Sequence, residues 1–191
     1  VIACCREFAL LSTALFRAKG IPARARCGFA LYLAEQGFYE DHWVCEYWNG
    51  TEWIAIDPQV DPFQQSTFQY YANTHQPIEP AYKEILLSLD PLHVTSKHFI
   101  NAGEAWQLYR NGKADPDRFG ISVDPKKYNL QTLYGAWFIR GQLLKDFAAL
   151  NKVESVPFLV RLEVGQDWQP WRLVSAKDEE LNNTDLELLD A

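Results

Sequence analysis

Apolar and polar positions recur with a helical period near the start of the chain. Between residues 4 and 18, four apolar residues are spaced three or four apart and form one stripe: Cys4, Phe8, Leu11 and Leu15. A neighbouring strip consists mostly of small residues, which another element can approach closely: Cys5, Ala9, Ser12 and Phe16. Arg6, Thr13 and Arg17 share the polar side. Gly20 and Pro22 end the pattern, so the sequence predicts a helix over residues 4–18.

The period then changes from helical to alternating. Every second residue from 23 to 33 is apolar, namely Ala23, Ala25, Cys27, Phe29, Leu31 and Leu33. This alternation predicts a half-buried strand. Two further strands are expected at roughly 42–48 and 52–57. They are joined by Asn49-Gly50, which is typical of a two-residue hairpin turn because both central residues need positive φ.

That hairpin predicts a register that brings two polar side chains together. With a two-residue loop, Trp48 pairs with Thr51 and His42 lies directly opposite Asp57. Their Cβ atoms are then about 4.5–5.5 Å apart on one face of the sheet. A loop one residue longer would pair Trp43 with Asp57 instead and separate the two side chains.

The second half of the chain is predicted to be mainly helical. Residues 58–77 are rich in Gln, Tyr and Pro without a clear period, and predict a long loop. Helices are expected at roughly 79–89, 97–110 and 129–150. The last has the clearest apolar side, more typical of core than of a ligand site, and this side includes Leu130, Leu133, Tyr134, Trp137, Phe138, Leu144, Phe147 and Ala148. Residues 156–174 are interpreted as strands or irregular structure, and a short helix is expected after Thr184 as its N-cap.

Composition narrows the class of protein. The 191 residues are 48% hydrophobic and 23% charged, enough to close one core without metal or disulfide. We expect a core over 1–65 and a helical extension over 66–191 packed on it as one structural domain. With 18 Lys+Arg against 25 Asp+Glu the net charge is −7, so nucleic acids and anionic membranes are poor partners.

Further features bear on the compartment in which the protein works. No apolar run approaches the roughly 20 residues that cross a membrane, and charges within residues 1–20 argue against a signal peptide. The chain contains no Met, so it is not expected to begin at its translational start. Four Cys, two of them adjacent, make no disulfide framework, which favours a reducing, cytoplasmic location.

Cys5 is the strongest candidate nucleophile. In the first turn of a helix, free N–H groups and the helix dipole stabilise a thiolate. An imidazole oriented by a carboxylate is the usual partner of such a thiolate, and His42 and Asp57 would supply both groups. The alternative for Cys5 is a small buried hydrophobe, as most free cysteines are. The remaining cysteines fall on apolar faces and are interpreted as core: Cys4, Cys27 and Cys45.

Other titratable residues carry weaker signals. No C-x-x-C pair is present, so a zinc site is not expected. The isolated His75, His93 and His98 are interpreted as surface or capping residues. Glu46 shares a face with His42, and the sequence leaves open whether it acts there or pairs with a nearby Arg at position 24 or 26.

Three separated blocks resemble the transglutaminase-like superfamily over about residues 4–60. The blocks are Cys5-Arg6-Glu7-Phe8-Ala9 with Gly20-Ile21-Pro22-Ala23-Arg24, then His42 with Glu46, then Trp53-Ile54-Ala55-Ile56-Asp57-Pro58. The resemblance implies an α+β, papain-like core in which the nucleophile helix packs on an antiparallel sheet. It also implies a triad with Cys5 as nucleophile, His42 as base and later acid, and Asp57 as the group that orients the imidazole.

The chain departs from the family at two points. The family usually places Trp two residues after the His, where this chain has Val44. The side-chain donor of the oxyanion hole normally lies upstream of the nucleophile, and only four residues precede Cys5, so the second donor is not assigned. The helical remainder resembles the extension of a bacterial branch of the superfamily.

Together these features predict cysteine-dependent acyl transfer on a peptide or protein amide. A thioester would be resolved by water, as in a protease or amidase, or by an amine, as in a transglutaminase, and hydrolysis is slightly favoured. The alternative is a non-catalytic, peptide-binding module on the same fold. No metal, organic cofactor, nucleic acid or membrane is implied, and the oligomeric state is open.

Overall fold

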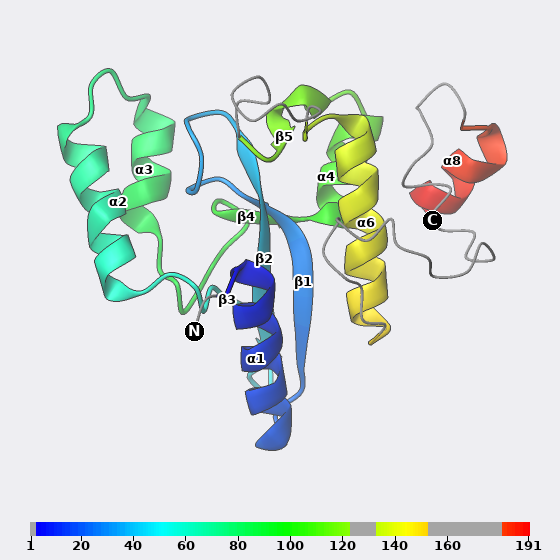
Figure 1. The fold of residues 1–191 in the computed structure, drawn as a ribbon, viewed down its shortest axis with the longest axis horizontal. Coiled ribbons are helices and arrows are strands. Elements are labelled where there is room, and N and C mark those ends of the chain that lie inside the picture. Colours follow the sequence, from blue (N-terminus) through cyan, green and yellow to red (C-terminus); the bar gives the residue numbers. More distant parts are fainter. Residues whose placement is uncertain (1–2, 123–132, 153–180) are drawn as a thin grey trace.

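Helices surround a central, mainly antiparallel sheet (Figure 1). The computed structural model describes residues 3–122, 133–152 and 181–191. Both helices and an antiparallel sheet are present, which confirms the predicted α+β class. None of the helices in these ranges is long and apolar enough to span a membrane.

Helix α1 (Cys5–Ala18) packs on the sheet through its small residues. Ala9 and Thr13 are buried, whereas Leu11 and Leu15 are each 59% exposed. The predicted helix is confirmed, but its leucine stripe faces outward and Thr13 lies on the packed side rather than the polar one. The face with small side chains packs on the sheet because it lets the backbone of α1 approach the strands closely. Thr13 meets its own hydrogen-bonding need by donating to the Ala9 carbonyl at 2.8 Å.

The sheet combines strands from both halves of the chain. Its strands are β1 (Ala23–Ala30), β2 (Tyr39–Trp48), β3 (Trp53–Ile56), β4 (Phe99–Asn101) and β5 (Phe119–Gly120). The order is β3-β2-β1-β4, and β5 pairs with β2 in parallel. Gly28 of β1 lies against β4, where a Cβ would overlap the Ile100 carbonyl oxygen. The region after residue 65 is therefore not purely helical, since it supplies two strands.

The loop between β2 and β3 is longer than predicted. Trp48 pairs with Trp53 rather than with Thr51, so residues 49–52 form a four-residue loop. The Asn49 side-chain oxygen accepts two backbone N–H groups within the loop, at 2.8 and 2.9 Å. The predicted two-residue turn is wrong because this side chain closes a wider loop on the same Asn-Gly pair.

Two helices form a hairpin beside the sheet, at the left of Figure 1: α2 (Pro62–Thr74) and α3 (Pro80–Ser88). The loop predicted over 58–77 is therefore wrong. Asp61 caps α2 by accepting the Gln64 N–H at 2.7 Å, and Pro62 occupies the first helical position. Of the residues in α2 only Ala72 is buried, so the helix has little apolar periodicity to reveal it.

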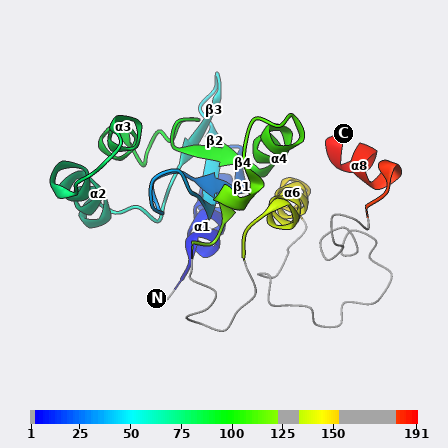
Figure 2. The same ribbon diagram turned by 90° about the horizontal axis from the view of Figure 1, so that it is seen from above.

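The remaining helices lie on the other side of the sheet. They are α4 (Ala102–Arg110), the short 3₁₀ helix η1 (Pro116–Arg118), α6 (Ala136–Leu150) and α8 (Asn183–Asp190). Seen from above, the sheet stands between the α2–α3 hairpin and the pair α4 and α6 (Figure 2). The helix predicted over 97–110 starts late because residues 99–101 pair with β1. The last helix begins after Asn182, not Thr184, and residues 156–174 lie outside the described ranges.

Helix α6 buries polar as well as apolar residues. Arg140, Gln142 and Asp146 are buried together with Phe138, whereas Phe147 is 65% exposed. The prediction that its aromatic side is core is therefore only partly confirmed. Gln142 and Asp146 have partners on β1, which a sequence period does not show.

Candidate active site

Cys5 is the first residue of α1, and its thiol is half-buried against the sheet. The side chain packs on a cluster of buried residues from α1, β1 and β2: Ala9, Ala25, Cys27 and Trp43. Two backbone N–H groups, those of Arg6 and Trp43, donate to the thiol sulfur. The second belongs to the residue that directly follows His42 on β2, so Cys5 is held one residue away from His42.

The protonation state of Cys5 differs from the sequence-based expectation. Burial raises the pKa of the Cys5 thiol to about 12, and the charge of the Asp41 carboxylate adds to the rise. The N–H groups of Arg6 and Trp43 act in the opposite direction. The cost of removing the thiolate from water therefore outweighs its stabilisation by the N–H groups at the start of the helix. Cys5 is a neutral thiol at neutral pH. A base has to remove its proton before it can act as a nucleophile.

His42 and Asp57 are in direct contact. His42 Nε2 lies 2.7 Å from Asp57 Oδ2, and the two residues are only 1% and 2% exposed. The longer loop changes the register of the hairpin by two residues, and side chains two apart point to the same face. His42 and Asp57 therefore share a face as predicted, although they are not directly opposite each other.

Asp57 has two further hydrogen-bond donors. Tyr32 Oη donates to Oδ2 at 2.5 Å, and the Gln59 N–H donates to Oδ1 at 2.9 Å. Burial alone would raise the pKa of Asp57, but the hydrogen bond and charge of His42, with the donors Tyr32 and Gln59, outweigh it and lower that pKa. Asp57 is therefore a carboxylate at neutral pH. Tyr32 was not predicted as a site residue, because its contact with Asp57 joins positions 25 residues apart in the chain.

The other cysteines have structural surroundings. Cys4 is exposed, which contradicts its assignment to the core. It is the N-cap residue of α1, and its thiol donates to Glu7 Oε2 at 2.7 Å. Cys27 and Cys45 are buried, as predicted. Cys27 Sγ donates to the side chain of Gln142 on α6 at 2.8 Å.

Glu46 is part of an ion-pair network and not a neighbour of His42. Its carboxylate lies 2.5 Å from Arg24 Nε and 3.2 Å from Arg26 Nη1, which settles the two alternatives in favour of pairing. Arg26 also contacts Asp146 of α6 at 2.8 Å, and Asp146 accepts the Cys27 N–H at 2.8 Å. Helix α6 is thus fastened to β1 close to the cluster that holds Cys5.

His98 does not lie on the surface as expected, since it is only 3% exposed. Its ring nitrogens are 3.0 Å from the hydroxyls of Ser88 and Thr95. These partners give it a structural role between α3 and β4. Within the described ranges, no group of His, Cys, Asp and Glu side chains is arranged to hold a metal ion.

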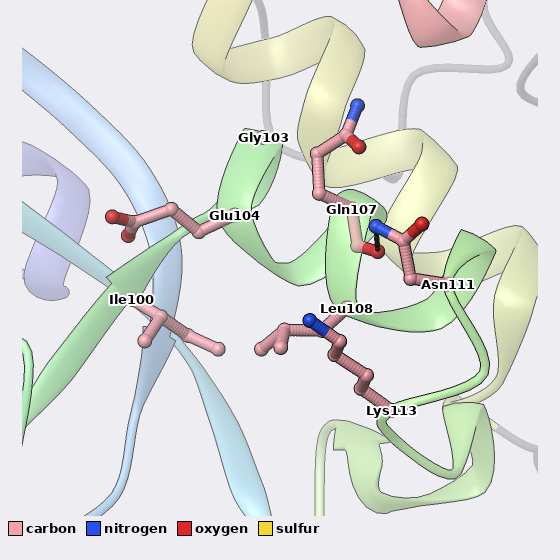
Figure 3. Close-up of a pocket in the computed structure, with 7 residues that line it drawn as sticks. All are labelled: Ile100, Gly103, Glu104, Gln107, Leu108, Asn111 and Lys113. Carbon is pink, nitrogen blue, oxygen red and sulfur yellow. Dashed lines mark hydrogen bonds between the residues drawn. The ribbon is translucent and has the colours of Figure 1, made fainter.

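Two surface hollows lie away from the predicted site. The larger, of about 540 Å³, is formed by β4, α4 and the turn after α4 (Figure 3). It is lined by Ile100, Gly103, Glu104, Gln107, Leu108, Asn111 and Lys113. A second, of about 200 Å³, lies near Trp53 and His93. Neither hollow is lined by Cys5, His42 or Asp57.

A helix that starts at a cysteine, packed on an antiparallel sheet with a buried His–Asp pair, suggests a thiol-dependent class of protein. Comparison with known proteins agrees at the level of family: residues 2–58 match the family model of the transglutaminase-like superfamily. This segment is therefore similar to that superfamily, whose members are usually enzymes. Searches of curated proteins and of solved structures returned no match.

Proposed function

We propose that the protein catalyses cysteine-dependent acyl transfer on peptide or protein amides, with Cys5, His42 and Asp57 as its triad. The observation that carries the proposal is the buried contact of 2.7 Å between His42 Nε2 and Asp57 Oδ2. The Cys5 thiol is held against the N–H of the next residue on β2. A His–carboxylate pair beside a thiol at a helix start is the general arrangement for an activated nucleophile.

The contact with Asp57 supports a separate role for each ring nitrogen of His42. Nε2 faces Asp57, so it carries a proton and donates it to the carboxylate. Nδ1 is then the basic nitrogen that takes the Cys5 proton. Because Cys5 is a neutral thiol in the free protein, we expect this transfer to occur as the sulfur attacks, rather than through a standing thiolate.

The proposed reaction has two half-steps. Sγ of Cys5 bonds to the amide carbon, and the oxyanion accepts the Cys5 N–H, one of the first-turn N–H groups of α1. His42 then protonates the leaving nitrogen as the C–N bond breaks, which leaves a thioester on Cys5. Water or an amine, deprotonated by His42, attacks the thioester and releases an acid or a new amide. Cys5 recovers its proton from His42.

A binding module is the second candidate, and burial of the pair favours it. His42 is only 1% exposed, so a substrate reaches the imidazole only after some movement of the surrounding residues. A protein that keeps this fold to hold a peptide would need no such access. The two candidates differ in whether Cys5 becomes acylated.

Incubation with a peptide library, with and without methylamine, tests the proposal. Wild type is compared with Cys5→Ala and with Cys4→Ser, a matched change in the adjacent cysteine. We expect products from wild type and from Cys4→Ser, and none from Cys5→Ala. Free acids indicate hydrolysis, and methylamides that appear only with added amine indicate transfer. Peptide retention without turnover in all three proteins would support the binding module and contradict catalysis.

A further inference from the structure

We propose that Tyr32 is a positioning residue that shares one oxygen of Asp57 with His42 and thereby weakens the hold of Asp57 on the protonated imidazole. The inference deepens the proposed function and rests on it for its catalytic meaning. The hydrogen-bond arrangement itself is measured without any activity.

Three groups meet at one atom. Tyr32 Oη donates to Asp57 Oδ2 at 2.5 Å, and His42 Nε2 lies 2.7 Å from the same oxygen. The Tyr32 ring also meets the His42 ring edge-on, with centroids 6.1 Å apart and planes at 81°. Tyr32 is 1% exposed, so water does not compete for this hydroxyl.

The Tyr32 hydroxyl and the His42 N–H compete for the same oxygen of Asp57. The phenol withdraws charge from Oδ2, which leaves the carboxylate a weaker acceptor for the imidazole N–H. A weaker acceptor stabilises the imidazolium form of His42 less. Removal of the phenol should therefore strengthen the hold of Asp57 on the protonated imidazole and leave less of the basic form to accept the proton of Cys5.

The α2–α3 hairpin holds the phenol in place. Tyr32 belongs to a cluster formed largely by this hairpin: Ala30, Val60, Ala72, Tyr82, Leu86 and Leu89. Phe68 of α2 packs edge-on against the Tyr32 ring at 5.8 Å. The hydroxyl is thereby fixed toward Asp57, and its removal creates no new charge and little change in shape.

Other charged groups act on the pair and stay the same when Tyr32 changes. On β2, Glu40 and Asp41 interact electrostatically with His42. From α6, Lys145 acts on Asp41, and from α1, Cys5 acts on Tyr32 at high pH. A difference between wild type and a Tyr32 variant near neutral pH therefore reports the phenol itself.

The test compares Tyr32→Phe with Tyr82→Phe in the full chain. Tyr82 lies in the same cluster, and Tyr82→Phe also removes a partly buried hydrogen bond, since the Tyr82 hydroxyl donates to the Ala34 carbonyl at 2.5 Å. NMR of the imidazole signals follows the protonation of His42 with pH. We expect its midpoint to rise by roughly 0.5–1 pH unit in Tyr32→Phe and to stay unchanged in Tyr82→Phe.

A second variant moves the midpoint the other way. Site-specific 3-fluorotyrosine at position 32 is a more acidic phenol and a stronger donor, so the midpoint falls below that of wild type. If activity is found, the acidic limb of kcat/KM follows the same order. Equal midpoints in wild type, Tyr32→Phe and the fluorinated protein would overturn the proposal. Shifted midpoints in a protein without acyl-transfer activity would leave the positioning role and refute the proposed function instead.

Discussion

The neutral state of the Cys5 thiol predicts slow alkylation with an unusual pH dependence. Burial, joined by the charge of Asp41, raises the pKa of Cys5 from 9.0 to about 12. The thiolate fraction changes tenfold per pH unit, so three units lower it about 1000-fold near neutral pH. Folded protein should therefore react with iodoacetamide about 1000 times more slowly at Cys5 than unfolded protein does.

The assay follows alkylation of Cys5 by mass spectrometry in a Cys4→Ser background, which removes the exposed neighbouring thiol. Rates are measured from pH 7 to 10, in buffer and in denaturant. In the folded protein the rate should still be rising tenfold per unit at pH 10. Asp41→Asn, which removes the nearby negative charge, should speed the reaction of the folded protein, whereas Glu84→Gln, at an exposed carboxylate, should not.

The pH dependence separates the two effects of burial. Shielding of the sulfur from the reagent lowers the alkylation rate by the same factor at every pH. The pH of half-maximal rate then stays near that of an ordinary thiol. Loss of solvation moves the midpoint itself. A plateau at or below about pH 9 in the folded protein would refute the reasoning that desolvation dominates at Cys5.

Three further predictions concern stability. Asp146→Ala leaves a buried guanidinium short of a partner and should lower the free energy of unfolding in urea by about 3 kcal/mol. Glu84→Ala, at an exposed pair, should leave the free energy of unfolding nearly unchanged. Gly28→Ala places a methyl group against a backbone carbonyl and should lower the free energy of unfolding by about 3 kcal/mol. Gly103→Ala, at the start of a helix, should have a smaller effect. Equal losses of stability in the two variants would contradict the close approach of β4 to Gly28. The pKa of Asp57 is lowered on folding, so the stability that its carboxylate contributes above about pH 4 is lost as the pH falls through the lowered value. When urea midpoints are measured over a series of pH values, Asp57→Asn should reduce the fall in this acidic range. An unchanged slope would count against the lowered pKa.

Local periodicity was sufficient to predict α1, the first three strands and the shared face of His42 and Asp57. The shared face was predicted correctly although the loop length was not. A shift of two residues in register leaves each side chain on the same face of the sheet, whereas a shift of one residue would have moved it to the other face. Periodicity did not reveal which side of α1 is buried. That choice depends on how closely the sheet approaches, and a close approach selects small residues over Leu11 and Leu15.

Features that depend on distant partners were not predictable in this way. Asp146 reaches Arg26 across 120 positions of the chain, and nothing near either residue indicates the other. Alternation over 23–33 placed Tyr32 on the polar face of the predicted strand, but it did not indicate the contact with Asp57, 25 positions along the chain. Helix α2 buries so little of its surface that only the Asp61-Pro62 pair signals its start, as an N-cap followed by a helix-compatible proline.

The contact between α6 and β1 also affects how the protein behaves at high concentration. Strand β4 pairs only with residues 28–30 of β1, so the half of β1 that begins at Ala23 has no strand partner on that side among the described residues. Open strand edges recruit strands of other chains and start aggregation. Asp146 of α6 accepts the Cys27 N–H at this edge, so the helix occupies the place where a strand of another chain would have to pair. The second half of the chain thus helps to keep the sheet from growing beyond its own molecule.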